Sequence, residues 1–241
     1  MGTKLIMKKI KKTIGVLGGM GAAASANFYQ KLVEIAQKDY GAIEDDDFPA
    51  IWIYNLPIQG FDETGFVDPE FVKSQLVESV KKLESIGSDF IVIPCNTVHH
   101  FIAEMRNAIN IPIISIIETA VKFANDSGYK KVGLLNSEST KNLKLYETAC
   151  IEHAIATLTA TDSEQSEINN VILNVIGGKQ GEKDAVALQK IVDRYKNDGA
   201  ESVVLGCTEL PLAFSQENCD LPVLNTITLL AKAALQHAYT K

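Results

Sequence analysis

Residues 87–97 read GSDFIVIPCNT, and residues 199–208 read GAESVVLGCT. In each stretch a glycine precedes a cysteine by eight residues, and an apolar run rich in valine and isoleucine lies between them. A glycine in this place is typical of a helix C-cap, and the apolar run predicts a fully buried strand of a parallel sheet. The repeat therefore predicts two equivalent strands, with Cys95 and Cys207 where these strands end.

The beginnings of the two halves also match, because residues 12–18 read KTIGVLG and residues 131–136 read KVGLLN. Around these runs, short apolar stretches alternate with segments of helical periodicity, such as the one that begins at Asp68-Pro69. This alternation is typical of parallel sheets with crossover helices. We therefore predict an α/β protein with two similar doubly wound parallel-sheet lobes, related by a pseudo-twofold axis, and with the active site in the cleft between them.

The two copies also predict how the chain is divided. The first lobe is expected to contain residues 11–112 together with residues 222–241, because the last helix has no strand after it and is expected to return to the first lobe. The second lobe is expected to contain residues 113–221. Apolar runs at residues 50–54 and 111–117 are predicted strands.

The composition excludes several classes of protein. The chain has 241 residues, of which 46% are hydrophobic, and a formal net charge of −7, which disfavours a surface that neutralises nucleic-acid phosphates. No run approaches the roughly 20 apolar residues of a membrane helix. The four cysteines are too few and too far apart for a disulfide framework, and no residue cluster has metal-ligand spacing. We expect a reduced, cytoplasmic protein that binds neither nucleic acid nor membrane.

Cysteines at the ends of parallel strands lie where α/β proteins bind ligands. If the two copies face each other, Cys95 and Cys207 lie on opposite walls of one cleft. A thiolate on one wall can then remove a proton from a carbon atom while the opposite thiol delivers a proton to the other face, which inverts the stereocentre without a cofactor. The short polar residues that follow each cysteine are suited to hold a carboxylate.

Three segments carry a family resemblance: residues 15–21 (GVLGGMG), 94–97 (PCNT) and 205–212 (LGCTELPL). Together they resemble the aspartate/glutamate racemase family, specifically its aspartate racemase branch, and the likeness runs from about Lys12 to the C-terminal helix. The resemblance implies an amino-acid racemase that needs no pyridoxal phosphate or other cofactor, acts on a small-molecule amino acid and leaves a homodimer open. It implies that the acid/base pair is Cys95 and Cys207 and that the substrate is held by Met20, Asn96, Thr97, Thr140 and Thr208.

The chain also departs from the family pattern. The Pro-Glu that usually follows the glycine turn is Ala22-Ala23 here, and the Asp expected before the last helix is Asn225. Aspartate-specific relatives hold the substrate's side-chain carboxylate with an Arg and a Lys, but residues 55–61 contain no basic residue, and the Lys position falls at Ile176, near Lys179. Because an unpaired buried carboxylate is costly, we expect no preference for aspartate over neutral amino acids.

Two other functions stay open on the sequence alone. One is a racemase or isomerase of another small carboxylate. The other is a non-catalytic protein that binds a nucleotide or anion, because residues 19–24 also match the glycine pattern of dinucleotide-binding loops. That match is incomplete, since the second predicted strand ends in Tyr54-Asn55 rather than in the acidic residue that holds a ribose. The roles of four residues stay open as well: His99, Glu118, Lys179 and Glu209.

Overall fold

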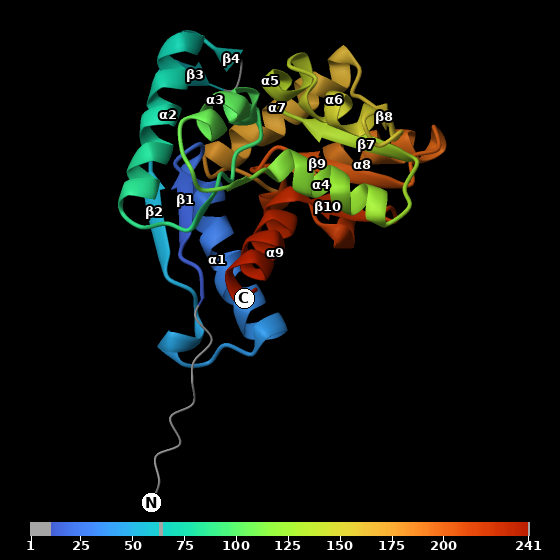
Figure 1. The fold of residues 1–241 in the computed structure, drawn as a ribbon. Coiled ribbons are helices and arrows are strands. Elements are labelled where there is room, and N and C mark those ends of the chain that lie inside the picture. The colour runs from blue at the N-terminus through green and yellow to red at the C-terminus, as the bar shows by residue number, and fades with distance from the viewer. Residues whose placement is uncertain (1–10, 63–64, 241) are drawn as a thin grey trace, which may run out of the picture.

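The computed structural model describes residues 11–62 and 65–240, which form two lobes (Figure 1). The first lobe contains a four-stranded parallel sheet of order β2-β1-β5-β6. Its strands are β1 (Ile14–Gly18), β2 (Ile51–Asn55), β5 (Phe90–Val92) and β6 (Ile113–Ile114). A small antiparallel hairpin of β3 (Phe61–Asp62) and β4 (Gly65–Phe66) lies beside it.

The second lobe contains a four-stranded parallel sheet of order β10-β9-β7-β8. Its strands are β7 (Lys131–Asn136), β8 (Ala156–Leu158), β9 (Ser202–Gly206) and β10 (Val223–Asn225). The order is that of the first sheet, with β7 in the place of β1 and β9 in the place of β5. The predicted α/β fold of two similar parallel-sheet lobes is therefore confirmed.

Helices cover the faces of both sheets. In the first lobe and its connection to the second these are α1 (Ala22–Tyr40), α2 (Pro69–Ser85), α3 (Ile102–Asn107) and α4 (Ile116–Asp126). In the rest of the chain they are α5 (Glu138–Asn142), α6 (Leu145–Ile151), α7 (Asp162–Ile176), α8 (Glu182–Asn197) and α9 (Thr226–Tyr239). Short 3₁₀ helices are η1 (Asp45–Asp47), η2 (Thr97–Phe101), η3 (Leu210–Leu212) and η4 (Gln216–Asn218). No helix within residues 11–62 and 65–240 combines the length and the apolar character of a membrane span.

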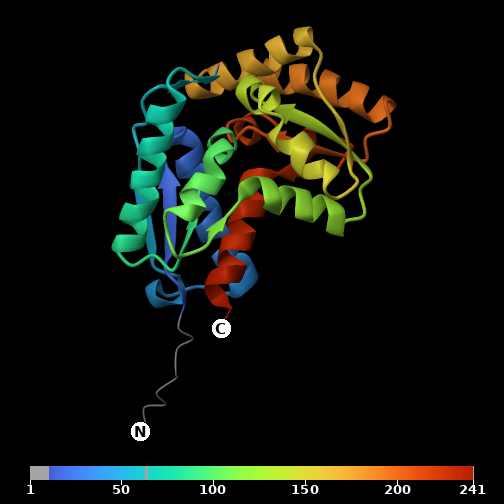
Figure 2. The same cartoon turned by 45° about the horizontal axis from the view of Figure 1, so that its top comes forward.

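The helices that follow the last strand of each sheet pack across the two lobes. Helix α4 follows the first sheet but contacts α6 of the second lobe, whereas α9 follows the second sheet but contacts α1 of the first lobe. The two helices also contact each other, as both views show (Figures 1 and 2). Their apolar sides share one hydrophobic cluster that contains residues of both sheets, such as Val16 and Leu134, so the lobes are joined by a common core.

The last strand of each sheet, β6 or β10, lies next to a predicted boundary between the lobes. The apolar run 111–117 forms only the short strand β6, because the Ser115 side chain accepts a hydrogen bond from the backbone N–H of Glu118 and so begins α4. Strand β6 pairs with β5, and β10 pairs with β9. The predicted division of the chain into two lobes stays a prediction. It assigns residues 11–112 and 222–241 to the first lobe and residues 113–221 to the second, so one boundary lies beside β6 and the other beside β10.

Candidate active site

The two cysteines of the repeat lie at the carboxyl ends of equivalent strands. Cys207 directly follows β9, and Cys95 follows β5 after two further residues. Both side chains are buried, with 6% exposure each, and both line one cavity between the lobes. The cavity is lined by Met20, Phe61, Cys95, Asn96, Thr97, Ser137, Gly206, Cys207, Thr208 and Glu209.

This cavity is closed. It holds about 20 Å³ of open space, which is roughly enough for a single water molecule and less than any amino acid occupies. The side chains that line the cavity therefore lie close together in this structure, and an amino-acid substrate needs more room between them.

A carboxylate lies beside the second cysteine. The Cys207 thiol donates to Oε2 of Glu209 over 3.1 Å, and the Thr208 hydroxyl donates to the same oxygen over 3.2 Å. Glu209 is only 4% exposed, and its other oxygen, Oε1, approaches Gly21 so closely that a Cβ there would lie 3.0 Å from it. Gly21 is the N-cap of α1, and a helix N-terminus stabilises negative charge. Glu209, whose role the sequence left open, is thus a residue of the site.

The first cysteine is held through its backbone. The Cys95 carbonyl lies 2.8 Å from Nδ1 of His99, whose Nε2 accepts a hydrogen bond from the backbone N–H of Ile116 over 3.3 Å. With Nε2 as an acceptor, the neutral ring carries its proton on Nδ1 and donates it to Cys95. Burial lowers the pKa of His99 to about 4, so the ring is neutral at ordinary pH. His99 lies outside the cavity lining and connects the Cys95 loop to the start of α4.

Hydroxyl groups from both lobes meet at one end of the cavity. The Thr97 hydroxyl lies 2.9 Å from that of Thr140 and 3.4 Å from that of Ser137, and Ser137 in turn bonds Thr140 over 3.0 Å. Thr97 begins η2 in the first lobe, whereas Ser137 and Thr140 follow β7 in the second. Thr140 is fully buried behind Thr97 and is not part of the cavity lining.

The cavity thus brings together six of the seven predicted site residues, with Thr140 one contact away. Sequence reasoning assigned no site role to three further lining residues, Ser137, Gly206 and Glu209. Glu209 lies only two residues after Cys207, which indicated a place near the thiol. A glutamate at the start of a helix can occupy the same position in a sequence, so the sequence did not decide its role. Among the described residues, no three His, Cys, Asp or Glu side chains converge as metal ligands do.

Among the described residues, those that line the cavity include no lysine or arginine. Ile176, at the end of α7, is 50% exposed, and Lys179 follows it in the loop before α8, so neither belongs to the lining. Phe61, from the loop that lacks a basic residue, does line the cavity. Within residues 11–62 and 65–240, the ionisable groups among the lining side chains are therefore the two thiols and the carboxylate of Glu209.

The glycine turn after β1 has a packing role. Gly19 adopts a φ of +99°, and a Cβ there would lie 2.3 Å from the carbonyl oxygen of Leu56. Only glycine allows the Leu56 backbone to pass this close. The turn places Met20 on the cavity, and the Glu209 carboxylate lies against the helix N-terminus where a nucleotide-binding loop would hold a phosphate. Both observations weigh against the nucleotide-binding alternative.

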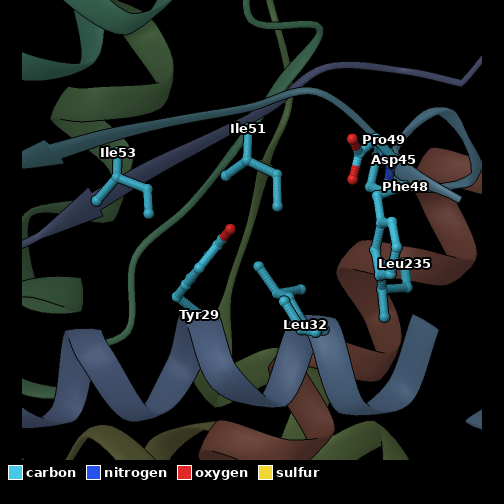
Figure 3. A pocket seen from close by; sticks show the side chains of 9 residues that line it. Tyr29, Leu32, Asp45, Phe48, Pro49, Ile51, Ile53 and Leu235 are labelled. Carbon is cyan, nitrogen blue, oxygen red and sulfur yellow. The ribbon is translucent and has the colours of Figure 1, made fainter. Parts of the chain in front are cut away.

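A larger cavity lies elsewhere, between β2 and α1 (Figure 3). It encloses about 440 Å³, and its lining is mostly apolar, with Tyr29, Ile51, Ile53 and Leu235 among its residues. Among the described residues that line it, the ionisable ones are Asp45 and Tyr29. The thiol pair of the cysteine site has no equivalent among them.

Comparison with known proteins identifies the family of this chain. Residues 17–234 match the family model described as Asp/Glu/Hydantoin racemase. The chain therefore belongs to this family, which confirms the predicted family and the predicted racemase class of enzyme.

Individual relatives match over nearly the whole chain. The chain is 26% identical over 222 residues to the broad specificity amino-acid racemase RacX of Bacillus subtilis (strain 168), covering 92% of this chain and 96% of that protein. An aspartate racemase homologue from Pyrococcus horikoshii OT3 superimposes with a TM-score of 0.82 at 27% identity, over 95% of this chain and 100% of the other. An aspartate racemase from Picrophilus torridus shares the fold, with a TM-score of 0.80 at 24% identity and 95% coverage of both chains.

Proposed function

We propose that this chain racemises free amino acids, with Cys95 and Cys207 as the acid/base pair. The observation that carries the proposal is that the two thiols, from equivalent ends of two equivalent sheets, line one closed cavity. Each thiol is followed by short polar residues suited to a carboxylate, namely Asn96 and Thr97 after the first and Thr208 after the second. No cofactor takes part in the proposed reaction.

The proposed reaction is a proton transfer at the α-carbon. One thiolate takes the α-proton, so the Cα–H bond breaks, an S–H bond forms and the electron pair passes into the substrate carboxylate. The opposite thiol then protonates the α-carbon on its other face and becomes the thiolate, which inverts the centre. Asn96 and Thr97 donate to the carboxylate, where negative charge develops, and Thr208 lies beside it, while Met20 packs against the substrate and Thr140 positions Thr97.

We propose further that the substrate has a neutral side chain. An acidic side chain in the cavity would face the carboxylate of Glu209 with no lysine or arginine among the described lining residues, and an unpaired buried carboxylate is costly. Phe61 instead offers an apolar surface. The broad specificity ascribed to RacX by its name is consistent with a side-chain pocket of this kind.

The proposed mechanism needs reduced thiols. All four cysteines are buried thiols and none forms a disulfide, which supports our proposal that the enzyme works in a reducing cytoplasm. A homodimer, which the resemblance leaves open, is not needed to complete the site, because both thiols and the groups around them come from a single chain.

The test is incubation of the protein with single L-amino acids in heavy water. A racemase that works through two thiols must introduce deuterium at the α-carbon as it inverts the centre, and both signals should be strongest for neutral amino acids. Proton NMR measures the loss of the α-proton, and chiral chromatography measures the enantiomers. If the folded protein neither exchanges nor inverts any amino acid of the panel, the proposed function is wrong.

A further inference from the structure

A hydrogen bond crosses from the second lobe to the loop of the first cysteine. The hydroxyl of Tyr146, on α6, donates to the side-chain carbonyl oxygen Oδ1 of Asn96 over 2.7 Å. Asn96 directly follows Cys95 and lines the cavity. Tyr146 does not line the cavity and has no place in the chemistry proposed above.

The other end of the same amide has no partner. Among the described residues, nothing accepts a hydrogen bond from Nδ2 of Asn96, and this atom is buried. A buried donor without an acceptor costs free energy. Because Oδ1 is already engaged by Tyr146, the group that Asn96 has left to offer is an NH₂ donor, which suits a carboxylate.

We propose that Tyr146 is a positioning residue, which fixes the side-chain amide of Asn96 so that its NH₂ group rather than its carbonyl oxygen meets the substrate carboxylate. The proposal rests on the proposed function, because it assigns a carboxylate to the cavity. In the opposite orientation Oδ1 would meet the carboxylate, and two acceptors would repel each other. The Tyr146 hydroxyl therefore favours the orientation of the Asn96 amide that presents NH₂ to the carboxylate over the orientation that presents Oδ1 to it.

The surroundings of Tyr146 suit this role. Its side chain is fully buried in the cluster shared by both lobes, so the ring cannot swing away without disturbing the core. Burial raises its pKa well above the usual value for tyrosine, which keeps the hydroxyl protonated and able to donate. Since Asn96 belongs to the first lobe and Tyr146 to the second, the amide is oriented only while the two lobes are in contact.

The first test is Tyr146→Phe, which removes the hydroxyl and keeps the ring. The oriented donor binds the carboxylate in the ground state and more strongly as negative charge develops, so its loss should raise KM about tenfold and lower kcat as well. Tyr195→Phe is the matched control. Tyr195 is equally buried, and its hydroxyl donates to the carbonyl oxygen of Leu134 over 2.8 Å, so this variant loses a similar hydrogen bond and should keep the wild-type KM.

The second test is the double variant Asn96→Ala with Tyr146→Phe. If Tyr146 acts through Asn96, the double variant should have the KM of Asn96→Ala alone. A Tyr146→Phe variant with an unchanged KM would overturn the proposal, and so would a further tenfold rise of KM in the Asn96→Ala background.

A third measurement does not depend on turnover. The ¹³Cγ resonance of Asn96 in the full chain, assigned by its absence from Asn96→Ala, should shift in Tyr146→Phe and stay in place in Tyr195→Phe. An unmoved resonance in both variants would overturn the role of Tyr146 even if the protein racemises amino acids. If the resonance shifts but the wild-type protein racemises nothing, the proposed function has failed, and the role of Tyr146 toward a substrate fails with it.

Discussion

The Cys207 thiol and the Glu209 carboxylate form a hydrogen bond of 3.1 Å, and the glutamate of this pair is not repeated in the sequence after the first cysteine. Two residues after Cys95 stands Thr97, whose hydroxyl bonds Thr140 across the lobes. The two halves of the site are therefore equivalent in fold but unequal in chemistry. A carboxylate can accept the thiol proton of Cys207, whereas the loop of Cys95 is anchored by the neutral ring of His99.

Glu209→Gln should slow racemisation about 100-fold, the scale of a lost general base. The two enantiomers of an amino acid have equal free energy, so kcat/KM must fall equally in both directions. The α-deuterium isotope effect should nevertheless grow for the enantiomer whose proton Cys207 removes, because that step becomes slower. Initial rates with α-deuterated and protonated enantiomers measure this. Exposed Glu217→Gln is the control, and a Glu209→Gln variant with wild-type rates would remove the carboxylate from the mechanism.

Cys95→Ala and Cys207→Ala should each abolish racemisation and leave the fold near intact. In heavy water each variant should still exchange the α-proton of one enantiomer, and the two variants should exchange opposite enantiomers, because the surviving thiol serves one face of the carbon. Proton NMR of each pure enantiomer follows the exchange. Cys219→Ser, which alters a buried thiol outside the cavity, should racemise normally. Unchanged racemisation in both alanine variants would contradict the two-thiol mechanism.

The enzyme should not prefer aspartate or glutamate over neutral amino acids. Comparison of kcat/KM over a panel of single amino acids checks this directly. A strong preference for aspartate would mean that a basic residue reaches the site when it opens, and Lys179→Ala would then be the first variant to make. If Lys179→Ala keeps that preference, the cation must come from another part of the chain.

His99 should make the protein less stable in acid. Its pKa is about 4 in the folded chain, below the value of 6.5 that an exposed histidine has. Between these two pH values the unfolded chain binds more protons at this ring, so the contribution of neutral His99 is complete above about pH 6.5 and is lost as the pH falls toward 4. The total change is roughly 3 kcal/mol.

Urea unfolding at a series of pH values measures this contribution. His99→Gln keeps a donor and an acceptor but cannot titrate, so its stability should fall less steeply between pH 6.5 and 4 than that of the wild-type protein. Exposed His153→Gln should keep the wild-type slope. Parallel curves for wild type and His99→Gln would contradict the neutral buried ring.

The repeat was sufficient to predict most of the fold and the place of the site. Strand ends follow from apolar runs of fixed length, so Cys95 and Cys207 could be predicted to lie at two equivalent sheet edges. The orientation of side chains across the lobes could not be predicted from the sequence, because it depends on contacts between segments that are far apart in the chain. Tyr146 has no motif that separates it from a core tyrosine such as Tyr195.

The crossing of α4 and α9 between the lobes has a consequence for the origin of the chain. A single copy of the repeated unit would leave its own sheet without one covering helix and its last helix without a sheet to cover. Two separate copies could satisfy both needs by exchanging these helices, which is the arrangement of a domain-swapped dimer. The present chain has the geometry of such a dimer fused into one polypeptide, and in a single polypeptide one half can contain threonine at the position where the other contains glutamate.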